Sequence, residues 1–122
     1  MSKVNSYRDL RVWQMGMTLV TEIYTATLTF PKAEMYGLIS QLRRAAVSVP
    51  ANIAEGFGRH TTRDYLNFLT IARGSMMEVE TLLQISRNLN YLEQQTLETL
   101  LEQTNHLARA LNALITSLRN KV

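Results

Sequence analysis

The chain has 122 residues and a mass of 13.9 kDa, which suffices for one hydrophobic core but not for two. Its net charge is +3, and arginine supplies ten of the thirteen basic residues. The absence of cysteine excludes disulfides and thiolate metal sites, and five glycines and two prolines are too few for a turn-rich β-sandwich. No apolar run approaches the about 20 residues of a membrane span, and the polar N-terminus lacks a signal-peptide pattern. We therefore expect a mostly helical, cytoplasmic protein without a membrane partner.

The first half of the chain carries two stretches in which apolar residues recur at spacings of three and four, as on one face of a helix. One helix is predicted over residues 7–28 and ends before Phe30-Pro31, because proline disfavours helical geometry in the residue before it. The next is predicted over residues 33–56 and stops at Gly56-Phe57-Gly58. Pro50 lies inside it and cannot donate to the carbonyl of Ala46, so a kink or break is expected there.

Two further apolar stripes follow in the second half of the chain. A helix is predicted over residues 61–88, with Thr61 or Thr62 as its cap, Asp64 in its first turn and Asn88-Leu89-Asn90 as its stop. Another is predicted over residues 93–120. Four long helices with short connections predict an all-α, up-down-up-down four-helix bundle that forms a single domain over residues 1–122.

The apolar residues of the first two helices exceed what one buried face requires. Those of the first helix cover more than one face, and the second helix is lined on its other surfaces by small residues that let neighbouring helices approach closely. We therefore expect a second contact surface, used between copies of the chain. Met17 and Met76 are assigned to the core, and the interface between copies is assigned to Val12, Met15, Leu19 and Met77.

Three stretches together carry a resemblance to a known family. They are Ser6–Gln14, Gln41–Arg59 and Tyr65–Leu83, the last with Ala72-Arg73-Gly74-Ser75 and Glu78 at its centre. The middle stretch is distinctive, since it combines an arginine pair, a run of small residues, a proline inside the helix and a terminal Gly-Phe-Gly-Arg. With these stretches the chain resembles the four-helix-bundle family named for the protein encoded in intervening sequences of bacterial 23S ribosomal RNA genes.

The resemblance covers nearly the whole chain and implies more than the residues do. It implies a cytoplasmic bacterial protein that assembles as a ring-shaped homo-oligomer, a homopentamer, with no established enzymatic activity. The family is also similar to the accessory protein of diversity-generating retroelements, a pentamer that binds nucleic acid and its reverse transcriptase. It has no catalytic motif to carry over onto this sequence, and its name identifies a fold better than a function.

Residues suited to catalysis or metal binding are few. His60 lies in a polar turn, and His106 lies off the apolar stripe of the last helix, so both are expected at the surface. Glu102 and His106 are four residues apart instead of the three that a di-iron bundle uses, and only one such pair exists. We therefore expect no catalytic residue, no metal and no cofactor, and we do not expect an enzyme.

The adjacent arginines Arg43 and Arg44 leave two interpretations open. They could form a phosphate clamp, or they could form structural ion pairs with Glu22 and Glu78, in the same subunit or the next. The antiparallel geometry of a bundle brings these carboxylates within reach, and arginine is the usual choice for buried or interface pairs. The ion pairs are the favoured interpretation.

The positions of the charges give a functional hint that does not depend on the family. In an up-down bundle one end collects seven basic residues against Asp9, Glu55 and Asp64, which makes +4, whereas the middle is expected to be neutral. Tyr7, Trp13 and Phe57 lie near that end, where they could stack bases but are favoured as buried anchors. The basic residues of this end are Lys3, Arg8, Arg11, Arg59, Arg63, Arg119 and Lys121.

Parallel copies around a ring would align these ends into a basic rim that attracts phosphate backbones. We expect nucleic acid, with RNA favoured over DNA, to bind through Arg8, Arg11, Arg59 and Arg63. The alternative function is a protein-interaction scaffold that docks a partner such as a reverse transcriptase. The expected partners are therefore further copies of the chain, RNA or DNA, and a protein partner.

Overall fold

The computed structural model describes residues 4–122, and this part of the chain contains four long α-helices and no strand. The prediction of an all-α protein with four helices is confirmed. Two short 3₁₀ turns, η1 (Tyr7–Asp9) and η2 (Lys32–Glu34), precede the first two helices. The helices are α1 (Arg11–Thr27), α2 (Leu38–Phe57), α3 (Thr62–Asn88) and α4 (Gln94–Arg119).

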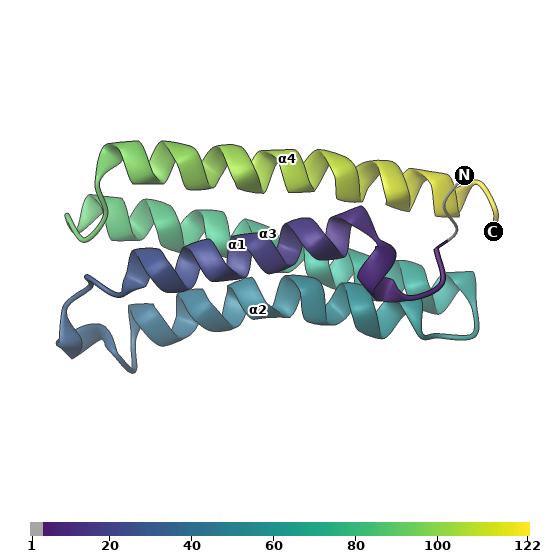
Figure 1. The fold of residues 1–122 in the computed structure, drawn as a ribbon, viewed down its shortest axis with the longest axis horizontal. Helices are drawn as coiled ribbons and strands as arrows, with labels where there is room; N and C mark the ends of the chain where they lie inside the picture. Colours follow the sequence, from purple (N-terminus) through teal and green to yellow (C-terminus); the bar gives the residue numbers. More distant parts are fainter. Residues whose placement is uncertain (1–3) are drawn as a thin grey trace.

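The four helices lie side by side, and the chain reverses direction at each connection (Figure 1). Each helix packs against its neighbours in the sequence, and α1 also packs against α4, which closes the bundle. The start of α1, the α2–α3 connection and the end of α4 therefore lie at one end of the molecule. The other two connections lie at the opposite end.

One hydrophobic core runs along the centre of the bundle. Every helix contributes residues at spacings of three and four, which is how an amphipathic helix buries one face. The best-buried side chains are Leu19 and Ile23 of α1, Leu42, Val49 and Ile53 of α2, Leu69, Val79 and Leu83 of α3, and Leu107, Leu111 and Ile115 of α4.

The first two helices begin later than the sequence predicts. The expected helix over residues 7–28 is interrupted at Leu10, whose φ of −73° and ψ of 126° are extended. Ser6 and Asp9 cause the interruption, because the Ser6 hydroxyl accepts from the Arg8 N–H while the Asp9 carboxylate accepts from the Ser6 N–H. The second helix begins at Leu38 instead of residue 33, and its first N–H donates to Glu34 Oε1 at 3.2 Å.

Pro50 does not break α2, which continues through it to Phe57 (Figure 1). Its ring is buried and faces Gly16 of α1, where an added Cβ would lie 3.3 Å from the Pro50 Cβ. The glycine therefore leaves room for the proline ring between the two helices. Pro50 cannot donate the usual backbone hydrogen bond, but α2 stays continuous and packs against α1 on one side and α3 on the other.

The remaining helix ends agree with the sequence. Gly58 follows the last residue of α2, and the Thr61 hydroxyl accepts from the Asp64 N–H at 3.1 Å, which makes Thr61 the cap of α3. The stop after α3 is made by Asn90, whose φ of 64° is the left-handed value that asparagine tolerates. The predicted stops of α2 and α3 and the predicted cap of α3 are thus confirmed.

Candidate nucleic-acid interface

The structure brings the four predicted phosphate-binding arginines to one end of the bundle. Arg8 lies in η1, Arg11 begins α1, Arg59 follows α2 and Arg63 lies in the first turn of α3, and all four are exposed. Arg119 and Lys121, at the end of α4, are exposed at the same end. Lys3, which the sequence also assigns to this end, lies outside the described residues. We call this surface the basic end.

The acidic residues of the basic end are engaged locally. Asp9 Oδ2 accepts from the backbone N–H groups of Asn5 and Ser6, at 3.0 and 3.2 Å. Asp64 lies in the first turn of α3, where a carboxylate favours the helix dipole. Glu55 forms an ion pair with Arg59 at 3.1 Å. The three carboxylates offset part of the positive charge, and the described basic residues of this end still outnumber them by six to three.

The four arginines differ in the contacts that their guanidinium groups make within the protein. Arg59 is held by Glu55, and its guanidinium lies 4.7 Å from the centre of the Phe68 ring. The Arg8 guanidinium lies 5.0 Å from the centre of the Tyr7 ring, which leaves its donors available to a ligand. Arg11 and Arg63 form no side-chain hydrogen bond or ion pair with residues 4–122. Arg11 and Arg63 are therefore the strongest candidates for phosphate contacts.

The aromatic side chains near the basic end pack against one another. Tyr7 and Trp13 meet edge to face at 5.3 Å between ring centres, and Phe57 and Tyr65 do so at 6.0 Å. All four side chains are half-buried. Their faces are used within the protein, which favours their role as anchors over base stacking.

The predicted ion pairs of the double arginine are not formed within this chain. Arg43 Nε donates instead to the Thr27 hydroxyl at 2.9 Å, and its guanidinium lies 4.4 Å from the centre of the Tyr24 ring. Arg44 and Glu78 line one hollow between α2 and α3 but do not come within 4.0 Å of each other. The pair Arg59–Glu55 is the one ion pair in the described part of the chain, and Glu22 forms none there. Pairing between copies stays a prediction.

The structure corrects part of the predicted interface between copies. Val12 and Leu19 are 5% and 2% exposed, so they belong to the chain's own core. Met15 is half-buried, whereas Met77 is 61% exposed. Met17, which the sequence assigns to the core, is 43% exposed. The error has one cause: α1 has apolar residues on several faces, and periodicity alone does not say which of them turns inward.

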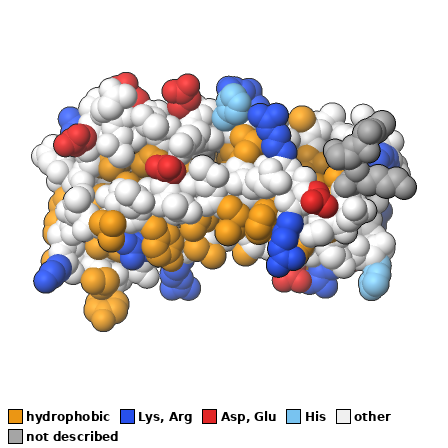
Figure 2. Space-filling model, viewed as in Figure 1, with side chains coloured by type: hydrophobic (Ala, Val, Ile, Leu, Met, Phe, Trp, Pro, Cys, Tyr) orange, Lys and Arg blue, Asp and Glu red, His pale blue; other side chains and the backbone are white. Residues whose placement is uncertain are grey.

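An apolar surface is nevertheless present on α1 and α2. Met17, Tyr24 and Leu28 recur at spacings of seven and four, so they share one side of α1, and all three are exposed. Val47 lies one turn after Arg43, which packs on Tyr24, and is exposed beside them. Figure 2 shows hydrophobic side chains gathered over these two helices. We call Met17, Tyr24, Leu28 and Val47 the α1–α2 apolar face.

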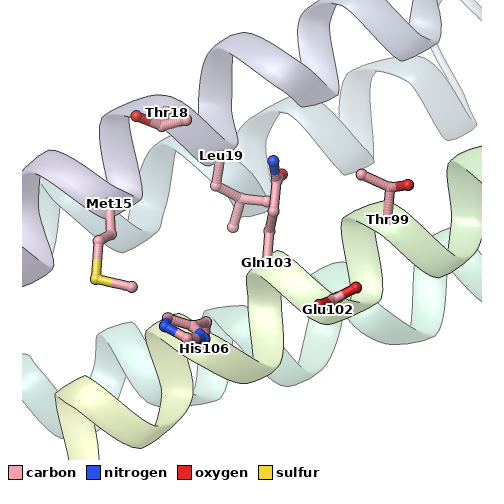
Figure 3. A pocket seen from close by; sticks show the side chains of 7 residues that line it. All are labelled: Met15, Thr18, Leu19, Thr99, Glu102, Gln103 and His106. Carbon is pink, nitrogen blue, oxygen red and sulfur yellow. The ribbon is translucent and has the colours of Figure 1, made fainter.

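A hollow of about 330 Å³ lies between α1 and α4 (Figure 3). Glu102, Gln103 and His106 of α4 line it opposite Met15 and Leu19 of α1. The Gln103 Oε1 atom is buried without a hydrogen-bond partner. His106 is exposed, as predicted, and its Nδ1 accepts from the Arg109 guanidinium at 3.2 Å. Within residues 4–122, His, Cys, Asp and Glu side chains do not form a group of three that could hold a metal ion.

None of the described helices combines the length and the apolar character that crossing a membrane requires. Residues 8–113 match the model of a protein family described as 23S rRNA-intervening sequence protein. The fold is similar to the crystal structure of a protein with unknown function from the S23 ribosomal protein family of Bacteroides thetaiotaomicron VPI-5482, with a TM-score of 0.77 and 20% sequence identity. That similarity covers 85% of this chain and 97% of the other. No curated protein matches the sequence.

Proposed function

The chain belongs to the 23S rRNA-intervening sequence protein family, and from its charge placement we propose that it is a non-enzymatic protein that binds RNA through the basic end. The observation that carries the proposal is the convergence of Arg8, Arg11 and Arg63 with the end of α4 at one end of the bundle. The six described basic residues of this end outnumber its three carboxylates, and one of these, Glu55, is already paired with Arg59. Clustered cations of this kind attract phosphate groups without reading base sequence.

The proposal includes assembly of parallel copies into a cytoplasmic ring, a pentamer by resemblance to the family, built from up-down-up-down bundles. The α1–α2 apolar face supports assembly, because exposed side chains such as Tyr24 and Leu28 gain free energy when a second copy covers them. In a ring of parallel copies the basic ends face the same side. The phosphate-binding surface then repeats around the axis, and the combined field exceeds that of one copy.

The proposal is tested by titrating a structured RNA with the protein over a range of salt concentrations. Binding is expected at about 50 mM NaCl and should fall steeply as salt rises, because each neutralised phosphate releases counterions. The double variant Arg11→Gln/Arg63→Gln should bind about tenfold more weakly and should lower the slope of log affinity against log salt by about two. Arg59→Gln alone should have a smaller effect, since Glu55 already neutralises that residue.

The matched control is Lys32→Glu, which lowers the net charge by the same two units at an exposed residue of η2, at the opposite end of the bundle. It should leave the salt slope unchanged. Absence of RNA binding at low salt, or an equal loss in Arg11→Gln/Arg63→Gln and in the control, would contradict the proposal. A protein partner that co-purifies in fixed ratio after nuclease treatment would instead favour the scaffold function.

A further inference from the structure

The contact between α3 and α4 places a second pair of arginines, Arg73 and Arg109, on neighbouring segments of the two helices. Arg73 Nη1 donates to Asn112 Oδ1 at 3.2 Å, which places the middle of α3 beside the corresponding part of α4. Arg109 lies one turn before Asn112 and is exposed, and its guanidinium donates to His106 Nδ1 at 3.2 Å on the same helix. Arg63 precedes Arg73 by ten residues and Arg119 follows Arg109 by ten, so each step along its helix is about 15 Å. Two pairs of arginines therefore lie along one flank, one pair at the basic end and one further inward.

This flank has almost no acidic residue. Neither residues 65–77 of α3 nor residues 103–122 of α4 contain an aspartate or glutamate. The carboxylates expected to balance the middle of the bundle lie elsewhere: Glu78 lines the α2–α3 hollow, and Glu102 lines the α1–α4 hollow. Along the upper edge in Figure 2, which α4 forms, most acidic side chains lie on the left, and basic side chains with a histidine follow to their right. The middle of the molecule is neutral in sum but not on this flank.

The side chains between the arginines are short, polar and uncharged. They are exposed, and no exposed aromatic residue accompanies them among the described residues of this flank. The strip ends one to two turns beyond Arg73, where Met77 and Glu80 follow. We call the four arginines and these polar residues the α3–α4 strip: Arg63, Asn67, Thr70 and Arg73 of α3, with Arg109, Asn112, Thr116 and Arg119 of α4.

The chemistry of the strip favours one form of nucleic acid. Proteins that bind single strands usually offer aromatic faces on which bases stack, and the aromatic rings of α3, Tyr65 and Phe68, already contact Phe57 and Arg59 within the protein. Duplex RNA is instead recognised through phosphates and 2′-hydroxyls across its wide, shallow minor groove. Arginines that flank a row of Asn and Thr side chains supply donors for the phosphates and both donors and acceptors for the hydroxyls.

We propose that the α3–α4 strip is a binding surface for double-helical RNA, which extends the basic end inward by about 15 Å. The inference rests on the proposed function, since the outer pair of arginines belongs to both. It adds Arg73 and Arg109 as phosphate contacts and the exposed polar side chains between the pairs as contacts to 2′-hydroxyls.

The test compares three probes: an RNA hairpin with about 16 base pairs, a DNA hairpin of the same sequence, and single-stranded oligouridine of equal length. The RNA hairpin should bind most tightly. In Arg73→Gln/Arg109→Gln its affinity should fall about tenfold, and the salt slope should fall by about two. The control Lys32→Glu should change neither quantity, and thermal melts should verify that both variants are folded.

The outcomes separate the inference from the function on which it rests. If none of the probes binds at about 50 mM NaCl, the proposed function fails. If Arg11→Gln/Arg63→Gln weakens binding while Arg73→Gln/Arg109→Gln behaves like the control, the proposed function stands. The assignment of the α3–α4 strip as an RNA-binding surface is then wrong. Oligouridine or DNA bound as tightly as the RNA hairpin would also overturn the assignment to duplex RNA.

Discussion

At the scale of single residues, the Tyr65 side chain combines a well-packed aromatic ring with an unpartnered hydroxyl. Its hydroxyl is buried and has no hydrogen-bond partner, although its ring packs edge to face on Phe57. Burial raises the pKa of this hydroxyl above its usual value of 10.0. A buried polar group without a partner loses its bonds to water and regains nothing, so the hydroxyl costs the folded state free energy.

Tyr65→Phe should therefore stabilise the protein, by about 1 kcal/mol at neutral pH, because the ring stays and the unpartnered oxygen goes. The pH dependence has a definite sign. Since the pKa of Tyr65 is higher in the folded state, its ionisation favours unfolding, and stability is lost as pH rises above about 10. Between pH 8 and about 10.5, the free energy of unfolding should fall less in Tyr65→Phe than in the parent protein. Urea unfolding at both pH values measures this, and a variant less stable than the parent protein at neutral pH would show that the hydroxyl has a partner.

At the scale of helices, the closest approach is that of α2 to α3. A Cβ added at Gly56 would lie 2.7 Å from the Phe68 Cβ and 3.2 Å from the Tyr65 carbonyl oxygen, which is backbone and cannot turn aside. Further along the same contact, the hydroxyls of Ser48 and Ser75 share a hydrogen bond at 2.8 Å. The small residues of α2 thus have the role that the sequence predicts, which is to let a neighbouring helix come near.

Gly56→Ala should destabilise the bundle by about 1–3 kcal/mol, because overpacking outweighs the better helix propensity of alanine. Gly74→Ala is the matched control, since Gly74 lies on the exposed side of α3 with nothing within 4 Å of an added Cβ. It should stabilise by about 0.5–1 kcal/mol. Thermal or urea unfolding compares the two, and a Gly56→Ala protein as stable as the control variant would mean that α2 and α3 separate easily.

How far the helices are predictable depends on which interactions decide each feature. The stops at Gly58 and Asn90 and the cap at Thr61 are made by residues adjacent in the sequence, so the sequence reveals them. Apolar periodicity does not predict the late starts of α1 and α2, because side-chain hydrogen bonds of Ser6, Asp9 and Glu34 compete with the first helical turn. The inward face of α1 and the position of Arg43 on Tyr24 depend on packing between helices, which periodicity does not specify.

At the scale of the whole molecule, two surfaces of different chemistry lie on different parts of the bundle. The α1–α2 apolar face lies on α1 and α2, and the α3–α4 strip lies on α3 and α4. The basic end lies at one end of the bundle and continues into the strip. The sequence located the basic end, because helix order alone brings those residues together. It did not reveal the strip, because seeing Arg73 and Arg109 on one flank requires knowing how α3 and α4 are rotated about their axes.

Salt should separate the two surfaces experimentally. Assembly through the α1–α2 apolar face should persist at about 0.5 M NaCl, where RNA binding is lost, because apolar contacts are not screened. Val47→Lys should shift the protein toward the monomer of 13.9 kDa, whereas Gln95→Lys, an equal charge change on an exposed position of α4, should not. Multi-angle light scattering measures the mass. A parent protein that is monomeric at all concentrations would contradict assembly through this face.

The start of α1 and the end of α4 share the tip that carries Arg8, Arg11 and Arg63. Anything fused to either end of the chain therefore lies next to those arginines, where an acidic reporter would offset their positive charge and a lysine-rich tag would add to it. The turn at Asn90, between α3 and α4, lies at the opposite tip. A label placed in that turn lies far from the arginines at the other tip, so salt screens its charge from them.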